Sequence, residues 1–304
     1  MDIPSKELKN GFKLPLYGIG TWYVGGDAGK INHAYDKADI NALKTAIDMG
    51  VTHIDTAELY ARGHAEELIG ESIKGYDREK LFITSKVKPE NFSYNNIIKS
   101  ARESIKRLNS KYLDLYLLHS YNPLISIKET MRGMDKLKSD GLIKNIGVSN
   151  FSIEKLEKAQ NETKNKIVVN QVLYNLTSRF PEDSGLLQYC QKNDIMIIAY
   201  TPVHRGIYNK NQIIILDKIA KKYDKAYSQI AINWLISQNN VVTISKTRNI
   251  EHLKENLGSL KFRMSNDDIE KLRNDFPHKK TSRFYYSNLY YVLMTGGMYI
   301  INKI

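Results

Sequence analysis

The chain has 304 residues, of which 42% are hydrophobic and 26% charged. This composition is typical of a globular protein with a large core, and the single cysteine, Cys190, excludes an intramolecular disulfide. The formal net charge of +12 raises the question of an anionic partner, but the lysines are dispersed without a basic block. Dispersed lysines favour solvated helix surfaces over a nucleic-acid partner.

Neither end of the chain carries a membrane signal. The N-terminal sequence MDIPSKELKNG lacks the apolar core of a signal peptide. The longest apolar run, residues 289–301, is interrupted by Gly296 and Gly297 and is too short to span a bilayer. We therefore expect a soluble, cytoplasmic protein with no membrane partner.

Short apolar runs alternate with helix-like segments along the chain. The β-branched, near-continuously apolar runs are predicted strands: 16–22, 51–57, 81–87, 113–119, 143–150, 167–174, 195–202 and 241–246. Helical periodicity lies between them at 39–51, 95–109, 152–160 and 227–237, and Gly50 is expected to end the first of these helices. Strands that alternate with helices in this way fit either a closed (β/α)8 TIM barrel or an open doubly wound sheet.

Two features favour the barrel, as a single domain over residues 1–304. The first strand is not followed by a G-x-G-x-x-G sequence, and polar residues of interest end several different strands, which is where barrels hold their chemistry. Ahead of the first strand, Asn10 and Gly11 stand between short alternating runs and predict a β-hairpin with a type I′ turn. We expect this hairpin to close the N-terminal end of the barrel.

Four polar residues at strand ends are candidate catalytic groups. Asp55 lies near the end of the second predicted strand and Tyr60 follows it, Lys86 lies next to the end of the third, and His119 ends the fourth. A lysine ammonium beside a phenol is expected to lower the phenol's pKa, and a carboxylate holds the lysine charged. With a histidine to orient a carbonyl oxygen, this set can protonate an oxygen that gains negative charge. Each residue alone has a structural explanation, and the combination favours catalysis.

Separated motifs resemble, in order and spacing, the aldo-keto reductases: HIDTAELY (53–60), ITSKV (83–87), DLYLLH (114–119), IGVSNF (146–151), NQVLYNL (170–176), AYTP (199–202) and EHLKENLG (251–258). The resemblance runs from about residue 18 to residue 272. It implies a (β/α)8 barrel that reduces aldehydes and ketones with NAD(P)H and without a metal. It also implies Tyr60 as the general acid, Lys86 and Asp55 as the groups that tune it, and His119 as the residue that positions the substrate.

The same resemblance implies a cofactor site. Ser149, Asn150 and Gln171 match the groups that hold the nicotinamide carboxamide, and Tyr200 matches the aromatic residue that stacks on its ring. Further cofactor contacts are expected at strand ends: Gly20, Thr21, Trp22, Asp55, Thr201, Pro202 and Val203. Two alternatives stay open, since Asn150 could be a helix N-cap and Tyr200 a core residue.

A phosphate and adenine clamp is implied after the last strand. Lys246, Thr247 and Arg248 lead into a helix N-terminus, which favours anions through its free N–H groups and its macrodipole. Two cations and a hydroxyl suit the 2′-phosphate of NADP. The clamp is completed by three residues of that helix: His252, Glu255 and Asn256. Since His252 stands where many NADPH-using relatives have arginine, NADH is the alternative to NADPH.

The sequence departs from the family at two places. Ser120 replaces the tryptophan that often follows the catalytic histidine, which predicts a wider or more polar substrate pocket with Trp22 as a remaining wall. Residues 283–304 do not resemble the family's C-terminal segment. Their two apolar runs around Gly296 and Gly297 predict a hairpin that either mediates self-association or covers the pocket.

These observations predict an NADPH-dependent oxidoreductase that reduces the carbonyl group of aldehydes, ketones or sugars, with Tyr60 as the general acid. Its partner would be a small carbonyl compound. The alternative is a catalytically idle NADP(H)-binding sensor or regulatory subunit on the same barrel. The sequence has no Cys/His pattern typical of a metal site, so no metal is predicted.

Overall fold

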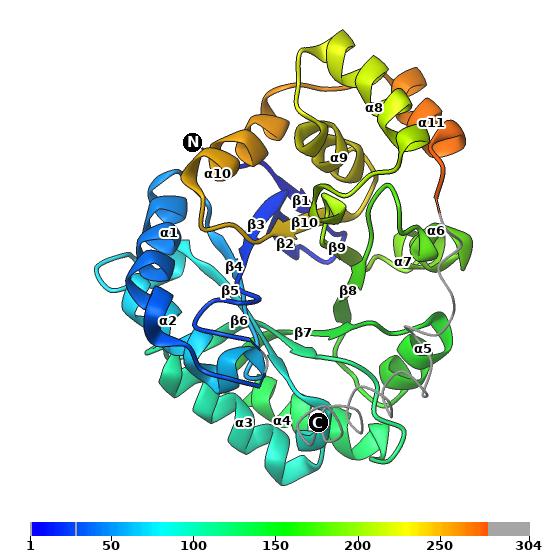
Figure 1. The fold of residues 1–304 in the computed structure, drawn as a ribbon. Helices are drawn as coiled ribbons and strands as arrows, with labels where there is room; N and C mark the ends of the chain where they lie inside the picture. The colour runs from blue at the N-terminus through cyan, green and yellow to red at the C-terminus, as the bar shows by residue number, and fades with distance from the viewer. Residues whose placement is uncertain (1, 28, 279–304) are drawn as a thin grey trace, which may run out of the picture.

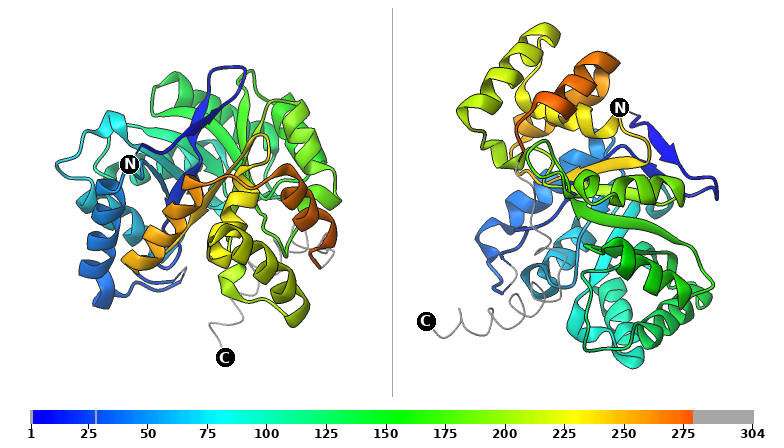
Figure 2. Two further views of the ribbon diagram at one scale, coloured as in Figure 1. Left: turned by 90° about the horizontal axis from the view of Figure 1, so that it is seen from above. Right: turned by 90° about the vertical axis from the view of Figure 1, so that its right-hand side faces the viewer.

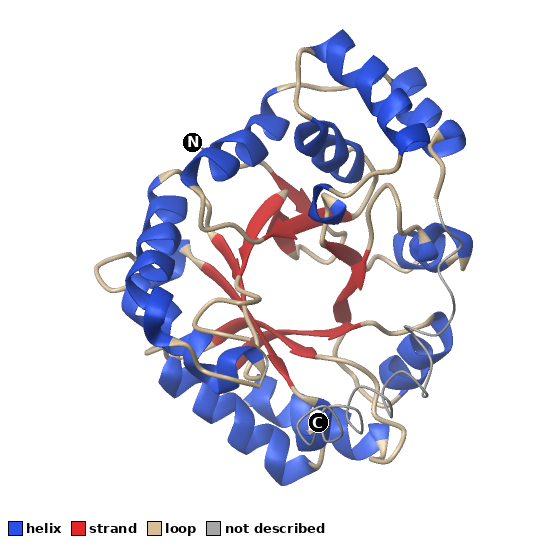
Figure 3. Ribbon diagram, viewed as in Figure 1, coloured by secondary structure: helices blue, strands red, loops and turns tan. Residues whose placement is uncertain are grey.

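The computed structural model describes residues 2–27 and 29–278. Within these residues, parallel strands form a closed barrel in the order β10-β3-β4-β5-β6-β7-β8-β9, and helices surround it (Figures 1 and 3). The barrel strands are β3 (Tyr17–Gly20), β4 (His53–Asp55), β5 (Phe82–Val87), β6 (Leu113–Leu118), β7 (Ile143–Ser149), β8 (Ile167–Leu173), β9 (Met196–Tyr200) and β10 (Val241–Ser245). Because β10 pairs with β3, the sheet is closed, and the predicted (β/α)8 barrel is confirmed.

Each predicted apolar run contains one barrel strand, trimmed by at most two residues at either end. Every residue of β6 is buried, as expected for a strand covered on one face by the barrel interior and on the other by helices. The predicted helix that precedes β4 ends where expected. Gly50 adopts a left-handed φ of 97°, and its N–H donates to the carbonyl oxygen of Ile47 at 2.8 Å.

Helices follow the strands around the barrel. The α-helices are α1 (Asp36–Asp48), α2 (His64–Ser72), α3 (Tyr94–Arg107), α4 (Ile127–Ser139), α5 (Ile153–Asn161), α6 (Phe180–Asp183), α7 (Leu186–Lys192), α8 (Lys210–Tyr223), α9 (Tyr227–Ile236), α10 (Ile250–Gly258) and α11 (Asn266–Asp275). Short 3₁₀ turns are η1 (His33–Tyr35), η2 (Tyr60–Gly63), η3 (Arg78–Lys80), η4 (Pro89–Asn91), η5 (His204–Gly206) and η6 (Ser259–Lys261). The turns η1 and η2 both bear on the sites described below.

The predicted N-terminal hairpin is present and crosses one end of the barrel (Figure 2). It pairs β1 (Ser5–Glu7) with β2 (Lys13–Pro15) in antiparallel register. The predicted type I′ turn is wrong, because that turn needs two left-handed residues and only Gly11, with φ of 84°, is left-handed. The loop is longer, and the N–H of Gly11 donates to the carbonyl oxygen of Leu8 at 2.9 Å.

The hairpin plugs the barrel with apolar side chains. Leu8, Phe12 and Leu14 are buried and share one hydrophobic cluster with inward-facing residues of the barrel strands: Leu115, Leu117, Val168, Val169, Met196, Ile198, Val242 and Ile244. This end of the barrel is therefore a packed core, and the predicted closure by the hairpin is confirmed. Polar groups are therefore expected at the opposite end, where the carboxyl ends of the strands meet.

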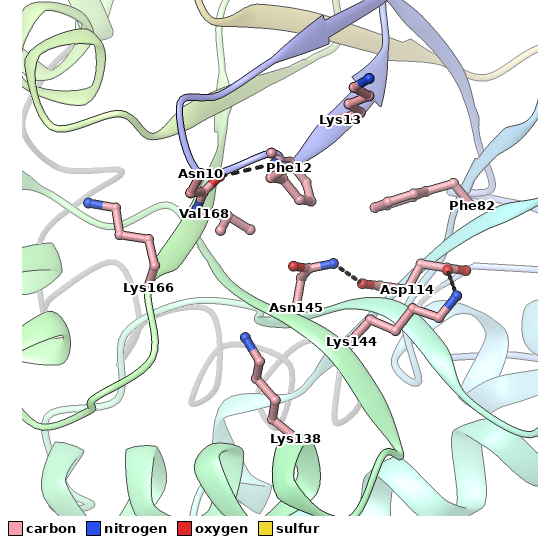
Figure 4. A pocket seen from close by; sticks show the side chains of 11 residues that line it. Asn10, Phe12, Lys13, Phe82, Asp114, Lys138, Lys144, Asn145, Lys166 and Val168 are labelled. Atoms are coloured by element: carbon pink, nitrogen blue, oxygen red, sulfur yellow. Dashed lines mark hydrogen bonds and ion pairs between the residues drawn. The ribbon is translucent and has the colours of Figure 1, made fainter.

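A pocket of 350 Å³ opens beside the hairpin, at the starts of the strands (Figure 4). Lysines line it together with Asp114: Lys13, Lys138, Lys144 and Lys166. Lys144 pairs with Asp114 at 3.1 Å, and Lys166 donates to the carbonyl oxygen of Asn193 at 2.6 Å. This pocket lies at the amino end of the barrel, away from the strand ends that carry the candidate catalytic residues.

In the described ranges, no helix combines the length and the apolar character needed to cross a membrane. The hairpin predicted for residues 283–304, with its roles in self-association or pocket closure, lies outside the described residues. The extent of the domain to residue 304 and the cytoplasmic location stay predictions.

Candidate active site

The four predicted catalytic side chains lie at the carboxyl ends of neighbouring strands. Asp55 is the last residue of β4, Lys86 lies next to the end of β5, and His119 directly follows β6. Since β4 pairs with β5 and β5 with β6 in parallel, these ends meet at one mouth of the barrel. Tyr60 comes from η2, which follows β4.

Lys86 is fully buried, and all three hydrogens of its ammonium have acceptors. Its Nζ donates to Asp55 Oδ2 at 2.6 Å, to the carbonyl oxygen of Thr56 at 2.7 Å and to Tyr60 Oη at 3.2 Å. The second carboxylate oxygen, Asp55 Oδ1, accepts from Gln171 Nε2 at 2.7 Å. The ammonium is thus fixed in orientation, with one N–H directed at the phenol oxygen.

A strained turn directly follows Tyr60. Ala61 and Arg62 both adopt left-handed φ values, of 47° and 56°, which cost about 1–3 kcal/mol each for residues other than glycine. The N–H of Ala61 donates to the carbonyl oxygen of Asp27 at 2.9 Å, so the loop after β3 helps to hold this turn. The Tyr60 ring meets the Trp22 ring edge-on at a centroid distance of 4.9 Å. The phenol is held from several sides.

The environment of Tyr60 keeps its phenol protonated. Burial raises the pKa of Tyr60 well above its ordinary value, and the Asp55 carboxylate raises this pKa further. The net shift of the pKa of Tyr60 is upward, so burial and the Asp55 carboxylate outweigh any lowering of this pKa by Lys86. Since Tyr60 Oη accepts a hydrogen bond from Lys86, it keeps its own hydrogen for a further acceptor.

The buried ion pair behind Tyr60 depends on both of its members. Burial lowers the pKa of Lys86 and raises the pKa of Asp55, and the attraction between the two charges opposes both shifts. Loss of either partner would leave the other as an uncompensated buried charge. The pair therefore holds a positive charge in a place where an isolated lysine would be costly.

His119 is neutral at the barrel mouth. Burial, followed by the charge of Lys86, lowers the pKa of His119 to about 3. Its Nδ1 is buried without a hydrogen-bond partner among the described residues, and its ring lies 5.7 Å from the Tyr60 ring, centroid to centroid. A neutral imidazole has one N–H donor and one acceptor nitrogen, so His119 can orient an oxygen without itself being an acid.

The predicted nicotinamide residues form one connected network. Ser149 Oγ donates to the carbonyl oxygen of Gln171 at 3.0 Å. Asn150 Nδ2 donates to the carbonyl oxygen of His119 at 3.4 Å, and Tyr200 Oη donates to Asn150 Oδ1 at 3.0 Å. The structure thus brings these residues together beside the catalytic group, to which Gln171 is joined directly.

Asn150 is not a helix N-cap. Ser152 caps α5, and its side chain accepts from the N–H of Lys155 at 3.4 Å. Asn150 instead adopts a left-handed φ of 59°, and Thr201 one of 58°. Such residues are uncommon and cluster at functional sites. Tyr200 is half-buried at the end of β9 and packs against the hydrophobic cluster of the barrel, so its role as a core residue stays an alternative.

The remaining predicted strand-end residues surround the same mouth. Gly20 pairs with Asp55 across β3 and β4, and Thr21 Oγ1 donates to the carbonyl oxygen of Asp55 at 3.0 Å. Trp22 is 37% exposed and Ser120 is half-buried, so both are open to a ligand. Three more follow β9: Thr201, Pro202 and Val203.

The predicted phosphate clamp lies between β10 and α10, and its cations differ in their partners. Arg248 Nη2 pairs with Asp39 Oδ2 at 3.0 Å and donates to the carbonyl oxygen of Tyr23 at 2.6 Å. Lys246 is half-buried, and within the described residues no carboxylate lies at ion-pair distance from it. Burial, followed by the charge of Arg248, lowers the pKa of Lys246. Lys246 is therefore the cation of the clamp that lacks an anion.

The start of α10 is already capped. The Asn249 side chain accepts from the N–H of Glu251 at 2.8 Å and from that of His252 at 3.4 Å. The expectation of free N–H groups at this helix start is therefore wrong for two of them. The side chain of Thr247 likewise turns to the backbone, and its Oγ1 donates to the carbonyl oxygen of Asn249 at 3.1 Å.

The helix residues of the clamp have different surroundings. His252 is exposed at the surface of α10. Glu255 accepts a hydrogen bond from Ser228. Asn256 is buried, and its Nδ2 donates to Ser245 Oγ at 3.2 Å. Of the three, only His252 presents a side chain without a described side-chain partner.

Sequence reasoning missed Asp39 and Asn249. Asp39 is buried on the face of α1 that also buries Ala42, Leu43 and Ala46. A carboxylate on the apolar face of a helix indicates a buried ion pair, because buried carboxylates need partners. Its partner Arg248 is 209 residues away in sequence, and helical spacing cannot reveal a contact at that separation.

Comparison with known proteins settles the family. The sequence model of the Aldo/keto reductase family matches residues 17–274. The chain belongs to this family. As a member, it is an oxidoreductase that acts on carbonyl and alcohol groups, and the resemblance found in its motifs is confirmed.

Relatives cover most of the chain. Methylglyoxal reductase YeaE of Escherichia coli is 36% identical over 271 residues, which are 88% of this chain and 93% of that protein. Glyoxal reductase of Bacillus subtilis is 34% identical over 270 residues, covering 88% of this chain and 90% of that protein. Both names describe reductases of small dicarbonyl compounds.

Solved structures share the fold. The thermostable aldo-keto reductase Tm1743, crystallised with the inhibitor epalrestat, superposes with a TM-score of 0.87 at 42% identity, covering 89% of this chain and 98% of that one. An aldo-keto reductase from Klebsiella pneumoniae in complex with NADPH gives a TM-score of 0.82 at 31% identity, covering 92% of this chain and 98% of that one.

Proposed function

We propose that this aldo-keto reductase uses NADPH to reduce small aldehydes, with 2-oxoaldehydes such as methylglyoxal and glyoxal as preferred substrates, and that Tyr60 is the proton donor. The observation that carries the proposal is the ammonium of Lys86, whose three hydrogen bonds end on Asp55, Thr56 and the phenol oxygen. This geometry holds a positive charge beside the phenol oxygen, where it can stabilise the phenolate that remains after Tyr60 donates its proton.

Tyr60 Oη gives its hydrogen to the carbonyl oxygen as that oxygen gains negative charge. NADPH, when bound, supplies the hydride to the carbonyl carbon. The Lys86 ammonium, 3.2 Å from Oη, stabilises the phenolate that remains. A raised pKa does not prevent the transfer, because an alkoxide is a stronger base than a phenolate.

His119 orients the substrate from the side. In residues 2–27 and 29–278 its buried Nδ1 has no partner, and an unpaired buried N–H is more costly to leave than an unpaired acceptor. We therefore assign the hydrogen to Nε2, from which it can be donated to the carbonyl oxygen. As His119 is neutral, it polarises the carbonyl group without competing with Tyr60 as a proton source.

The residues present fit NADPH. Lys246 is a half-buried cation without a carboxylate partner in the described residues, which suits the 2′-phosphate. The amide groups of Asn150 and Gln171, with Ser149, suit the nicotinamide carboxamide, and Tyr200 lies beside them to stack on the ring. Arg248, already paired with Asp39, would close the loop after β10 toward the loop after β3.

The preference for small dicarbonyl compounds rests on two observations. The two relatives described above are named methylglyoxal reductase and glyoxal reductase. Ser120 stands half-buried beside His119, where it can donate a hydrogen bond to the second oxygen of a 2-oxoaldehyde. A bulky apolar substrate gains nothing from that hydroxyl.

The test is NADPH oxidation with a panel of methylglyoxal, glyoxal, glyceraldehyde, benzaldehyde and glucose. The proposal predicts turnover, with the highest kcat/KM for methylglyoxal and glyoxal. NADPH binding without turnover of any compound would support the idle cofactor-binding subunit instead. Titration with both cofactors tests the clamp, and equal or tighter binding of NADH would contradict the NADPH assignment.

A further inference from the structure

A second cluster of polar side chains lies outside the catalytic mouth, where the loop after β3 meets α2. His33 belongs to η1, Asp36 begins α1, and His64 begins α2. The helices α1 and α2 pack side by side on one flank of the barrel (Figure 1). His33 Nδ1 and His64 Nε2 lie 2.8 Å and 3.0 Å from the same oxygen, Asp36 Oδ2.

We propose that His33, Asp36 and His64 bind a divalent transition-metal ion of the zinc type. Their ligand atoms all lie within 4.8 Å of one another. Two imidazole nitrogens and one carboxylate oxygen form a donor set that suits Zn²⁺ and Co²⁺. With ligands at about 2.0–2.1 Å, neighbouring donor atoms of a tetrahedral zinc site lie roughly 3.3 Å apart. The two contacts to Asp36, at 2.8 Å and 3.0 Å, therefore need to open by only a fraction of an ångström, and the two imidazole nitrogens already lie within 4.8 Å of each other.

A fourth residue orients one of these ligands. The second ring nitrogen of His64, Nδ1, lies 2.8 Å from Glu67 Oε2. Metal-binding histidines commonly donate their other N–H to a carboxylate, which fixes the tautomer and makes the ligating nitrogen more basic. In the metal-bound state Glu67 would hold the hydrogen on Nδ1, so that Nε2, which now lies 3.0 Å from Asp36 Oδ2, can bind the ion.

The backbone around the cluster is ordered by local contacts. The N–H of Asn32 donates to the carbonyl oxygen of Gly25 at 2.8 Å, and the Asn32 side chain caps η1 by accepting from the N–H of Ala34 at 3.0 Å. Gly25 has a φ of 69°, and a Cβ there would lie 2.8 Å from Cδ2 of His64. Only glycine lets the loop pack this closely against the imidazole, so the ring position is fixed.

The site is open on one side to solvent. The side chain of His33 is 70% exposed, that of Asp36 22% and that of His64 9%. An ion can therefore enter from the solvent side, past the exposed His33 side chain. The exposed side leaves room for a water molecule as a fourth ligand.

Metal binding would stiffen the segment that holds Tyr60. His64 follows η2 directly, and Asp27, in the same loop as His33, accepts from the N–H of Ala61. An ion that joins His33 to His64 ties this loop to the start of α2. Because the ion binds the folded state, it should raise the midpoint of thermal unfolding. The ion has no part in the proposed proton transfer.

The test uses the full chain after dialysis against a chelator. Calorimetric titration with Zn²⁺ is expected to give one ion per chain, and Co²⁺ is expected to develop the visible absorption of a tetrahedral site. His33→Ala and His64→Ala should each weaken Zn²⁺ binding at least as strongly as Glu67→Gln, for which about a 10–100-fold loss is expected.

His278→Ala is the matched control, since His278 lies 3.3 Å from the carboxylate of Asp183 without belonging to a three-ligand group in the described residues. Its Zn²⁺ affinity should equal that of the wild type. Absence of Zn²⁺ binding by the wild type would overturn the proposal. So would equal binding by the wild type and His33→Ala, which would place the ion elsewhere. Because binding is measured directly, these results do not depend on the proposed carbonyl reduction.

Discussion

The candidate catalytic group and the proposed phosphate clamp lie at the same mouth of the barrel, but their lysines differ in how they are paired. Around Lys86, each hydrogen of a buried cation is already paired within the protein, with Asp55 as the counter-charge. Around Lys246, a half-buried cation has no carboxylate partner among the described residues, and its pKa is lowered by burial. The first cation is paired within the protein, whereas the second is left for the phosphate that we propose as its partner.

This difference follows from the roles that we propose for the two lysines. A catalytic cation must keep its charge and direction throughout the reaction, so its partners belong to the protein. A cation that recognises a phosphate gains most when it has no competing partner. Changes in the first group should therefore affect turnover and stability, whereas changes in the second should affect cofactor affinity alone.

The largest effect is expected for Lys86→Met. Removing the ammonium leaves the Asp55 carboxylate buried beside Gln171, which should cost about 3–5 kcal/mol in the free energy of unfolding. It also removes the group that stabilises the phenolate, so kcat should fall roughly 10²–10⁴-fold. Denaturant unfolding and steady-state rates measure the two effects.

The double variant Lys86→Met/Asp55→Leu separates the effect on stability from the effect on kcat. Replacing both charges with apolar side chains should recover much of the lost stability, but it cannot recover kcat. If the double variant regained both stability and full activity, the ammonium would have a structural role only, and the contrast with the clamp would fail.

A smaller effect is expected for Lys246→Ala. Loss of a charge-assisted hydrogen bond to phosphate is worth about 1.5–3 kcal/mol, so the Kd for NADPH should rise roughly 10–100-fold. Affinity for NADH and kcat at saturating cofactor should not change. Lys254→Ala is the matched control, because Lys254 is exposed on α10 and pairs with Glu251 at 2.8 Å. Equal loss of NADH affinity would argue against a phosphate partner.

The smallest effect is expected from pH. The pKa of His119 is lowered to about 3, and burial raises that of Tyr60 well above its ordinary value. Neither group should titrate between about pH 5 and pH 9, since the imidazole is neutral above its lowered pKa and the phenol protonated below its raised one. Carbonyl reduction at saturating substrate should be flat across this range. A rate that falls with an apparent pKa near 7 would contradict one of these assignments.

The barrel and the meeting of the candidate catalytic residues at one mouth could be predicted because strand ends are visible in the sequence. Asp55, Lys86 and His119 each lie at or near the end of an apolar run, and parallel strands bring such residues to one edge. The pKa of Tyr60 could not be predicted in the same way, since its direction depends on burial that only the packed structure reveals.

Contacts between distant segments were also hidden. Arg248 looks like a free phosphate-binding cation in the sequence, but Asp39 pairs with it across 209 residues. His33 and His64 are too far apart in sequence to suggest a shared site, and the packing of α1 against α2 brings them together. Local patterns identified the elements and their ends, whereas the partners of individual charges depended on tertiary packing.

The most direct measurement of the central claim is single-turnover oxidation of NADPH by methylglyoxal in Tyr60→Phe. This change removes only Oη, the atom that accepts from Lys86 at 3.2 Å, and keeps the ring that packs against Trp22. The affinity of this variant for NADPH is expected to be unchanged, and its hydride-transfer rate is expected to be lowered roughly 10²–10⁴-fold. Hydride transfer at the wild-type rate in this variant would contradict the role of Tyr60 as the proton donor.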